Sequence, residues 1–247
     1  MLRGMPEPMI VAHRGANVDL PEQTLPAYVR AVEVGADAVE CDVRLTRDGH
    51  LVCHHDRTVD RTSNGRGAIS GQTLAELQKL DFSGRREPVA GEQHQILPFV
   101  QLLRLINEAP RRVRMLVETK HPSRFGAEVE RALHRALADF PGLDVTVMSF
   151  ARAAVSRYRT MDPAVPLVWL YEFPLGTVPE AAGIVGPRLS LVRSKPDLIR
   201  QAHDAGRKVY VWTANRPEDV EFLAGLGADA VITDDPAMAL ATLGRTP

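Results

Sequence analysis

Short apolar runs alternate with longer amphipathic stretches along most of this chain. Strand-like runs occupy residues 9–12, 38–44, 114–118, 144–149, 165–170, 188–192, 208–212 and 230–233. Apolar residues with helical spacing lie between most of them, over residues 25–34, 99–107, 124–139, 152–161, 196–205 and 217–226. Near-continuous apolar strands that alternate with helices are typical of a buried parallel sheet.

Eight such units in 247 residues predict an α/β protein with a closed (β/α)8 barrel, the TIM-barrel fold, in one domain spanning residues 1–247. In the fifth unit, residues 172–186 contain Gly and Pro near their start, so we expect a short or missing helix. Residues 57–96 form a loop-rich excursion after the second strand, with one short helical patch at residues 74–80. An excursion of this length suggests a functional cap or loop.

Composition excludes several classes of function. Lys and Arg total 30 against 31 Asp and Glu, a balance that argues against nucleic-acid binding. The sequence shows neither the apolar region of a signal peptide nor a membrane-length apolar run, so we expect a cytoplasmic protein without stable membrane insertion. The two cysteines, Cys41 and Cys53, are too few for a disulfide scaffold.

Carboxylates stand where two of the predicted strands end. In a barrel of this kind the active site forms at the carboxyl ends of the strands. Glu40 and Asp42 are two residues apart on one strand and therefore share a face, and Glu118 ends the next barrel strand. Three oxygen ligands without a thiolate suit one hard cation, Mg2+ or Ca2+. The alternative is that Glu40 or Asp42 pairs with an arginine.

Histidine and arginine side chains end other strands. His13 and Arg14 follow the first strand, and a further extended piece, residues 51–53, leads into His54 and His55. Two imidazoles and a guanidinium around a hard cation are the groups that phosphoester chemistry requires. Strand alternation directs His54 and His55 to opposite faces, and periodicity alone does not say which one faces the site.

Lys120 and Trp212 are further candidates. Lys120 lies two residues beyond Glu118, so a carboxylate and an ammonium reach the same rim unless Lys120 is a plain surface residue. Trp212, at a strand end, is either part of the core or an apolar wall for the carbon skeleton of a substrate. Cys41 points away from Glu40 and Asp42, toward the helices that pack on the sheet.

These pieces, in this order, resemble the glycerophosphodiester phosphodiesterase family over residues 10–236. The matching stretches are Ala12-His13-Arg14-Gly15-Ala16, Pro21-Glu22-Gln23-Thr24, Gly35-Ala36-Asp37, Glu40-Cys41-Asp42-Val43, Leu45-Thr46-Arg47-Asp48-Gly49, His55-Asp56, Asp60-Arg61-Thr62-Ser63-Asn64-Gly65, Leu97-Pro98, Val117-Glu118-Thr119-Lys120, Val209-Tyr210-Val211-Trp212-Thr213 and Ile232-Thr233-Asp234.

The resemblance implies a TIM barrel that hydrolyses glycerophosphodiesters, a small-molecule substrate, to an alcohol and glycerol 3-phosphate with a divalent metal. Carried over by position, the metal carboxylates are Glu40, Asp42 and Glu118. The acid/base histidines are His13 and His55, which selects His55 over His54. Arg14 corresponds to the phosphate-binding arginine, and Lys120 and Trp212 correspond to residues that line the substrate pocket.

The chain departs from the family pattern at Gln23, where the family usually has Asn. The longer side chain predicts loss of a local turn hydrogen bond, and we expect the candidate metal ligands to be untouched by it. Two other functions remain open: a related barrel phospholipase of the C or D type acting on lysophospholipid or phospholipid, and a catalytically silent phosphate-ester binding protein. A phospholipase would be expected to show an apolar rim or a basic interfacial patch.

Overall fold

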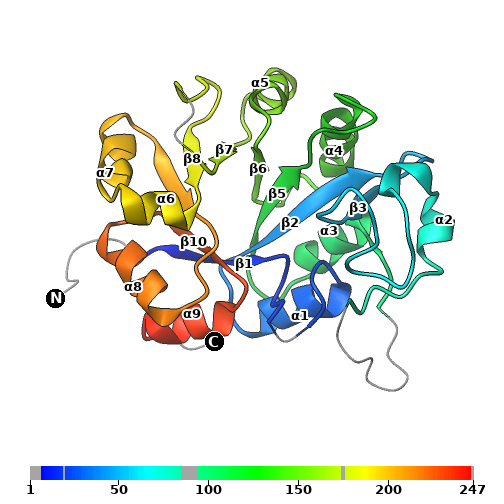
Figure 1. Ribbon diagram of the computed structural model, residues 1–247, viewed down its shortest axis with the longest axis horizontal. Helices are drawn as coiled ribbons and strands as arrows, with labels where there is room; N and C mark the ends of the chain where they lie inside the picture. Colours follow the sequence, from blue (N-terminus) through cyan, green and yellow to red (C-terminus); the bar gives the residue numbers. More distant parts are fainter. Residues whose placement is uncertain (1–6, 19, 85–93, 174–175, 246–247) are drawn as a thin grey trace.

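The computed structural model describes residues 7–18, 20–84, 94–173 and 176–245. Within these residues, eight parallel strands form a barrel (Figure 1). Strand β1 pairs with both β2 and β10, which closes the sheet. The barrel strands are β1 (Met9–His13), β2 (Ala38–Leu45), β5 (Arg114–Thr119), β6 (Val145–Ser149), β7 (Leu167–Tyr171), β8 (Ile184–Pro187), β9 (Lys208–Val211) and β10 (Ala230–Thr233). The predicted TIM-barrel fold is therefore confirmed.

Helices surround the strands on the outside of the barrel (Figure 1). Each buries one apolar side against the sheet; in α1, for example, Ala27, Tyr28 and Ala31 are the buried residues. The helices are α1 (Leu25–Glu33), α3 (Phe99–Asn107), α4 (Glu128–Ala138), α5 (Arg152–Met161), α6 (Leu189–Ser194), α7 (Asp197–Asp204), α8 (Pro217–Gly225) and α9 (Pro236–Thr242).

The side chains of the strands alternate between two apolar clusters, and this alternation sets up the site. In β2, Val39 and Cys41 belong to the cluster between the barrel and the helices, whereas Ala38 belongs to the cluster inside the barrel. Glu40 and Asp42 therefore point inward, above the apolar interior, and Cys41 points to the helices as predicted.

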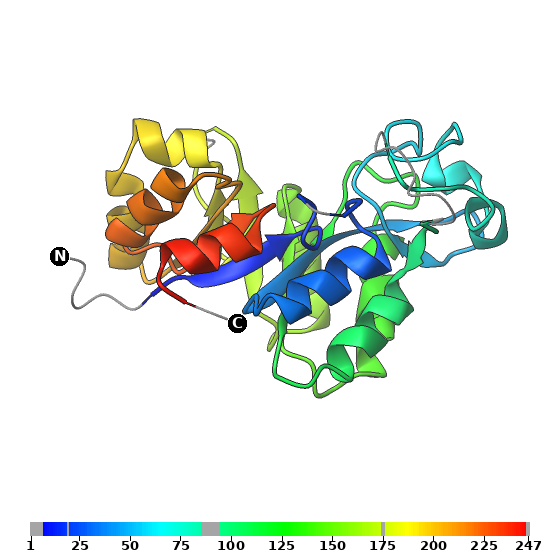
Figure 2. The ribbon, with the colours of Figure 1, turned by 90° about the horizontal axis from the view of Figure 1, so that it is seen from below.

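The excursion after β2 lies to one side of the barrel in both ribbon views (Figures 1 and 2). Strand β3 (Leu51–Cys53) pairs antiparallel with β2, and β4 (Leu97–Pro98) pairs antiparallel with β3. Between them lie the short helices η1 (Ile69–Gly71) and α2 (Leu74–Leu77), and residues 85–93 fall outside the described part. The excursion packs an apolar cluster against Val52 of β3, formed by Val59, Ile69, Leu77, Phe82 and Ile96.

The prediction of a strand at residues 188–192 was wrong. The sixth barrel strand is β8, which ends at Pro187, and the helix α6 begins at Leu189. A short apolar run cannot be assigned to strand or helix by periodicity alone, and Gly186-Pro187 resembles a turn in the sequence. Gly186 nevertheless lies within the strand, where a Cβ would meet Leu170 Cδ2 at 2.5 Å. As expected for the fifth unit, no helix occurs among residues 172–173 and 176–183.

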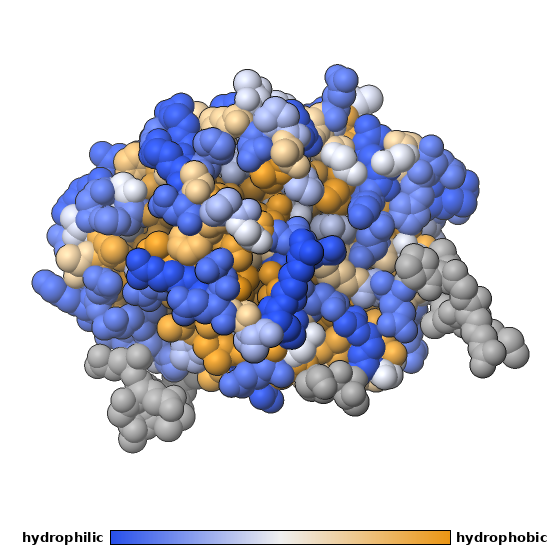
Figure 3. Space-filling view, turned by 180° about the vertical axis from the view of Figure 1, so that it is seen from behind, coloured by the Kyte–Doolittle hydropathy of each residue, from blue (hydrophilic) through white to orange (hydrophobic). Residues whose placement is uncertain are grey.

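The outer surface is mixed in polarity. Viewed from behind, polar residues cover much of the molecule and apolar residues gather between them (Figure 3). None of the helices in the described ranges has the length and apolar character needed to span a bilayer.

Candidate active site

Three carboxylates meet inside the carboxyl end of the barrel. Asp42 and Glu118 are register partners across β2 and β5, and Glu40 lies opposite His13 of β1. Glu40, Asp42 and Glu118 are all buried, and one oxygen from each lies within 4.8 Å of the others. The three predicted metal ligands are thus brought together, and the group could hold a metal ion.

Two cations lie against these carboxylates. Lys120 Nζ lies 3.1 Å from Asp42 Oδ1 and 2.9 Å from Glu118 Oε1, and Arg14 Nε lies 3.3 Å from Asp42 Oδ2. Although burial raises the pKa of Asp42, Lys120 and Arg14 outweigh it and hold that pKa well below its usual range. Burial and the neighbouring Asp42 raise the pKa of Glu40 well above its usual range. Among the residues that the structure describes at this end of the barrel, three buried carboxylates therefore lie beside only two cations, Lys120 and Arg14.

Gln23 contacts one of these carboxylates directly. Its Nε2 donates to Asp42 Oδ2 at 2.6 Å, and its Oε1 accepts from the Tyr28 hydroxyl at 2.7 Å. The buried Gln23 has φ of 62°, a left-handed conformation that is uncommon for residues other than glycine and that these contacts help to hold. The expectation that the Gln substitution leaves the candidate ligands untouched was wrong: the longer side chain helps to hold Asp42.

His13 is oriented by a carboxylate from the last strand. Its Nδ1 lies 2.6 Å from Asp234 Oδ1, just beyond β10, and Asn17 and Asn215 also donate to Asp234. Burial raises the pKa of Asp234, but hydrogen bonds from His13, Asn17 and Asn215 lower it to about 2. Because a carboxylate accepts at Nδ1, the other ring nitrogen, Nε2, is left for chemistry.

His55, rather than His54, faces the site. His55 lines the same cavity as His13, and its Nδ1 lies 2.6 Å from Asp56 Oδ1. His54 is buried against the excursion, with Nε2 3.1 Å from the Thr58 carbonyl and its ring in an edge-to-face contact with Phe82. Burial lowers the pKa of His55 to about 4, so its ring is neutral at pH 7 and can accept a proton.

Arg14 lies at the turn that follows β1. Its backbone has φ of 59°, and its N–H donates to the Glu40 side chain at 3.1 Å. Gly15 follows because a Cβ there would lie 2.8 Å from the backbone of Ala27. Arg14 Nη1 donates to Glu22 at 2.9 Å. The guanidinium is thereby fixed beside the carboxylate cluster, where it can bind a phosphate.

These groups open into one cavity of about 210 Å³. Its other half is largely apolar, and Trp212 and Phe150 meet edge to face there with ring centroids 5.3 Å apart. The Trp212 indole donates to the Gly186 carbonyl at 2.8 Å, which fixes the ring. The structure therefore places Lys120 and Trp212 in the lining of the cavity. The lining residues are His13, Arg14, Glu40, His55, Glu118, Lys120, Met148, Phe150, Leu170, Glu172, Trp212 and Ile232.

Several side chains that support the site were not singled out from the sequence. Asp234 stands directly after a predicted strand, so the search for polar residues at strand ends could have found it. Asp56 and Glu22 occur in the matched motifs, but nothing in the sequence showed what they contact. Phe150 and Glu172 also follow strands, β6 and β7, and line the cavity.

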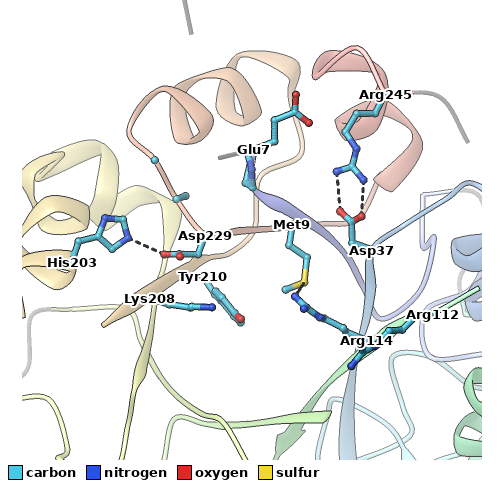
Figure 4. Close-up of a pocket in the computed structure, with 13 residues that line it drawn as sticks. Glu7, Met9, Asp37, Arg112, Arg114, His203, Lys208, Tyr210, Asp229 and Arg245 are labelled. Carbon is cyan, nitrogen blue, oxygen red and sulfur yellow. Dashed lines mark hydrogen bonds and ion pairs between the residues drawn. The ribbon is translucent and has the colours of Figure 1, made fainter. Parts of the chain in front are cut away.

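A larger cavity, of about 890 Å³, lies at the opposite end of the barrel, where the strands begin (Figure 4). Charged side chains line it, and four of them form two separate pairs. Asp37 binds Arg245 through two contacts, the shorter 2.6 Å, and His203 Nε2 lies 2.8 Å from Asp229 Oδ2. This end holds none of the candidate catalytic residues.

Comparisons with known proteins show the family to which the chain belongs. The model of the "Glycerophosphoryl diester phosphodiesterase family" matches residues 13–238. The chain is 41% identical to "Probable glycerophosphodiester phosphodiesterase 1" of Mycobacterium tuberculosis, over 96% of this chain and 92% of the relative. It is 34% identical to "Glycerophosphodiester phosphodiesterase" of Caldanaerobacter subterraneus, over 92% and 94% of the two chains.

A solved structure confirms the fold. A phosphodiesterase of Oleispira antarctica, in complex with its product sn-glycerol-3-phosphate, superposes with a TM-score of 0.85 over 97% of each chain, at 24% identity. The extent of the family match and the identity to the two relatives allow one conclusion: the chain belongs to the glycerophosphoryl diester phosphodiesterase family and is a phosphodiester hydrolase.

Proposed function

We propose that this chain hydrolyses glycerophosphodiesters to an alcohol and glycerol 3-phosphate, with one divalent cation held by Glu40, Asp42 and Glu118. The observation that carries the proposal is the convergence of three buried carboxylates, two histidines and an arginine at the carboxyl end of the barrel, where all of them except Asp42 line one cavity. The names of the relatives, and the product bound by the Oleispira antarctica phosphodiesterase, support the substrate class.

The carboxylate cluster fits a hard cation. Its three buried oxygen donors lie within 4.8 Å of one another, and only two basic side chains of the described residues, Lys120 and Arg14, lie against them. Oxygen donors alone favour Mg2+ or Ca2+ over softer metals. When bound, the cation would withdraw charge from the nonbridging phosphate oxygens.

The side chains divide the acid and base work. Arg14 binds the phosphate and offsets the charge that develops on it. One histidine removes the proton from the glycerol 2-hydroxyl, whose oxygen attacks phosphorus, and the other protonates the oxygen of the leaving alcohol. This first step leaves a cyclic glycerol phosphate. Water then opens the ring to give glycerol 3-phosphate, with the two histidines reversing roles. Asp234 and Asp56 hold the tautomer that leaves each Nε2 available.

The remaining assignments follow from this function. Lys120 steadies Asp42 and Glu118 near the phosphate, and Trp212 with Phe150 provides an apolar wall for the carbon skeleton. We further propose that residues 1–247 form one domain, and that the enzyme acts in the cytoplasm on a small molecule.

A substrate panel tests the proposal. The purified protein, supplied with Mg2+ or Ca2+, should release glycerol 3-phosphate and choline from glycerophosphocholine. Release of choline or phosphocholine from lysophosphatidylcholine, without any hydrolysis of glycerophosphocholine, would instead identify a barrel phospholipase. Binding of a diester without turnover under any of these conditions would identify a silent binding protein and contradict the proposal.

A further inference from the structure

One guanidinium links the excursion to both sides of the candidate active site. Arg61 belongs to the stretch Asp60-Arg61-Thr62-Ser63-Asn64-Gly65, whose residues the proposed mechanism does not use. Its Nε donates to Asp56 Oδ2 at 2.6 Å. Its Nη1 and Nη2 donate to the two oxygens of Glu22 at 2.6 and 2.9 Å. Arg61 thus uses three donors on two carboxylates that come from different parts of the chain.

Each of those carboxylates also contacts a residue of the candidate active site. Asp56 Oδ1 lies 2.6 Å from His55 Nδ1, while Asp56 Oδ2 accepts from Arg61. Glu22 Oε1 accepts from Arg14 Nη1 at 2.9 Å as well as from Arg61. The contacts therefore run continuously from Arg14 through Glu22, Arg61 and Asp56 to His55.

The charges along this network balance. Two guanidiniums alternate with two carboxylates, and the carboxylates are only about a quarter exposed, with side-chain values of 21% for Glu22 and 27% for Asp56. Burial raises the pKa of each, but the hydrogen bonds from Arg61 outweigh it and lower both below their usual values. Both therefore remain ionised and can hold their partners at neutral pH.

We propose that Arg61 is a positioning residue for the phosphodiesterase reaction, because it fixes Glu22 and Asp56 and through them the orientations of Arg14 and His55. This inference rests on the proposed function for the roles of Arg14 and His55. It also gives the excursion a role in catalysis, since its loop supplies a side chain that ties the phosphate-binding arginine to an acid/base histidine. Arg61 itself touches no reacting atom.

The chain offers a matched control for a merely structural role. Arg47 also ties the excursion to the barrel, since its Nη2 contacts both oxygens of Glu76 at 3.1 and 3.0 Å and its Nη1 donates to the Gly71 carbonyl at 2.8 Å. Its side chain is about as exposed as that of Arg61, at 51% against 42%. Neither Glu76 nor Gly71 lines the cavity. Arg47→Gln therefore measures how far kcat and KM change when the excursion loses the contacts of one arginine that lies away from the cavity.

The test compares Arg61→Gln with Arg47→Gln on glycerophosphocholine. We expect Arg61→Gln to lower kcat by about 10- to 100-fold and to raise KM, as one or two charge-assisted hydrogen bonds lost around the reacting groups imply. Arg47→Gln should stay within about twofold of the unmodified protein in both constants. Arg61→Lys should recover part of kcat, because one ammonium can hold Glu22 or Asp56 but not both. Equal kcat values for the two Gln variants would overturn the proposal.

A double-mutant cycle shows whether Arg61 acts through its partner. If it does, Arg61→Gln should lower kcat much less in an Asp56→Asn background than in the unmodified protein. Full additivity of the two changes would contradict a role through Asp56.

A second readout needs no substrate and separates this inference from the proposed function. The Nδ1 proton of His55, assigned by its loss in His55→Gln, should give a downfield NMR resonance that broadens or disappears in Arg61→Gln and persists in Arg47→Gln. If the unmodified protein hydrolyses no diester, the proposed function fails, and this resonance still decides whether Arg61 holds Asp56 and His55. An unchanged resonance in Arg61→Gln would overturn the positioning role.

Discussion

The two ends of this barrel both carry charged cavities, yet they are built differently. At the end where the strands begin, the cavity measures about 890 Å³, and two of its carboxylates are each paired with one basic side chain, Asp37 with Arg245 and Asp229 with His203. At the carboxyl end the cavity is about 210 Å³, and three carboxylates cluster beside Lys120 and Arg14, which pair with Asp42 and Glu118.

Burial sharpens this difference. Asp37 and Arg245 are 30% and 29% exposed, so water screens their attraction and the pair contributes modestly to stability. Glu40, Asp42 and Glu118 are at most 6% exposed, where uncompensated negative charge is costly. Crowded buried carboxylates destabilise a fold, and are therefore a stronger sign of function than the size of a cavity.

The largest effect should come from breaking the carboxylate cluster. Asp42→Asn removes a proposed metal ligand and a partner of both Lys120 and Arg14, and should lower kcat at saturating Mg2+ by about 10³-fold or more, since a bound cation is worth several kcal/mol. Its control is Asp37→Asn at the opposite end, which should keep kcat within about twofold. Comparable losses in both variants, measured by glycerol 3-phosphate release, would remove the distinction between the two ends.

The histidines come next. His13→Ala and His55→Ala should each lower kcat by about 10²- to 10⁴-fold, because each would lose one proton transfer. His203→Ala is the control, since His203 also pairs with a carboxylate but lies at the opposite end. Calorimetry should show Mg2+ or Ca2+ binding retained in all three variants. Unchanged turnover in His13→Ala or His55→Ala would refute the assigned roles.

A smaller effect on kcat should follow from neutralising Asp234, the carboxylate that orients His13. Asp234→Asn keeps the shape of the side chain but removes the charge that fixes the ring, so kcat should fall by about 10- to 100-fold. Asp229→Asn releases His203 in the same way and should leave kcat nearly unchanged. Steady-state kinetics on glycerophosphocholine measures both, and a loss confined to KM in Asp234→Asn would argue against an orienting role.

The smallest effect concerns stability in acid. The pKa of Asp234 falls from 3.8 to about 2 on folding, so its ionised form stabilises the fold. That contribution, about 2 kcal/mol, should be fully present above pH 4 and should be lost as the pH falls through 2. Urea unfolding of the unmodified protein and of Asp234→Asn should therefore converge with decreasing pH. A difference that does not change between pH 6 and pH 2 would contradict the lowered pKa of Asp234 and the hydrogen bonds from His13, Asn17 and Asn215 that cause it.

Much of the barrel and of the reacting groups could be predicted from the sequence, because both depend on local order along the chain. Apolar runs located seven of the eight barrel strands, and the residues at strand ends included His13, Arg14, Glu40, Asp42 and Glu118. The exception, β8, is a four-residue strand that ends in Gly186-Pro187. There the pattern was too short to distinguish strand from helix.

The supporting contacts could not be predicted, because they join distant segments. Asp234 lies 221 residues from His13, and Arg61 lies 39 residues from Glu22. The choice between His54 and His55 needed more than alternation, since β3 ends at Cys53 and the rule of alternate faces ends with it. Gln23 illustrates the same limit, as only the folded chain shows that it binds Asp42.

The central claim is that a divalent cation at the carboxyl end of the barrel supports diester hydrolysis, and metal removal tests it most directly. Protein stripped with EDTA and freed of the chelator would be followed by 31P NMR on glycerophosphocholine while Mg2+ or Ca2+ is added back. The account predicts no glycerol 3-phosphate before addition, saturable recovery with one equivalent of cation bound, and no recovery in Asp42→Asn. Full turnover by stripped protein that mass spectrometry shows to be metal-free would contradict it.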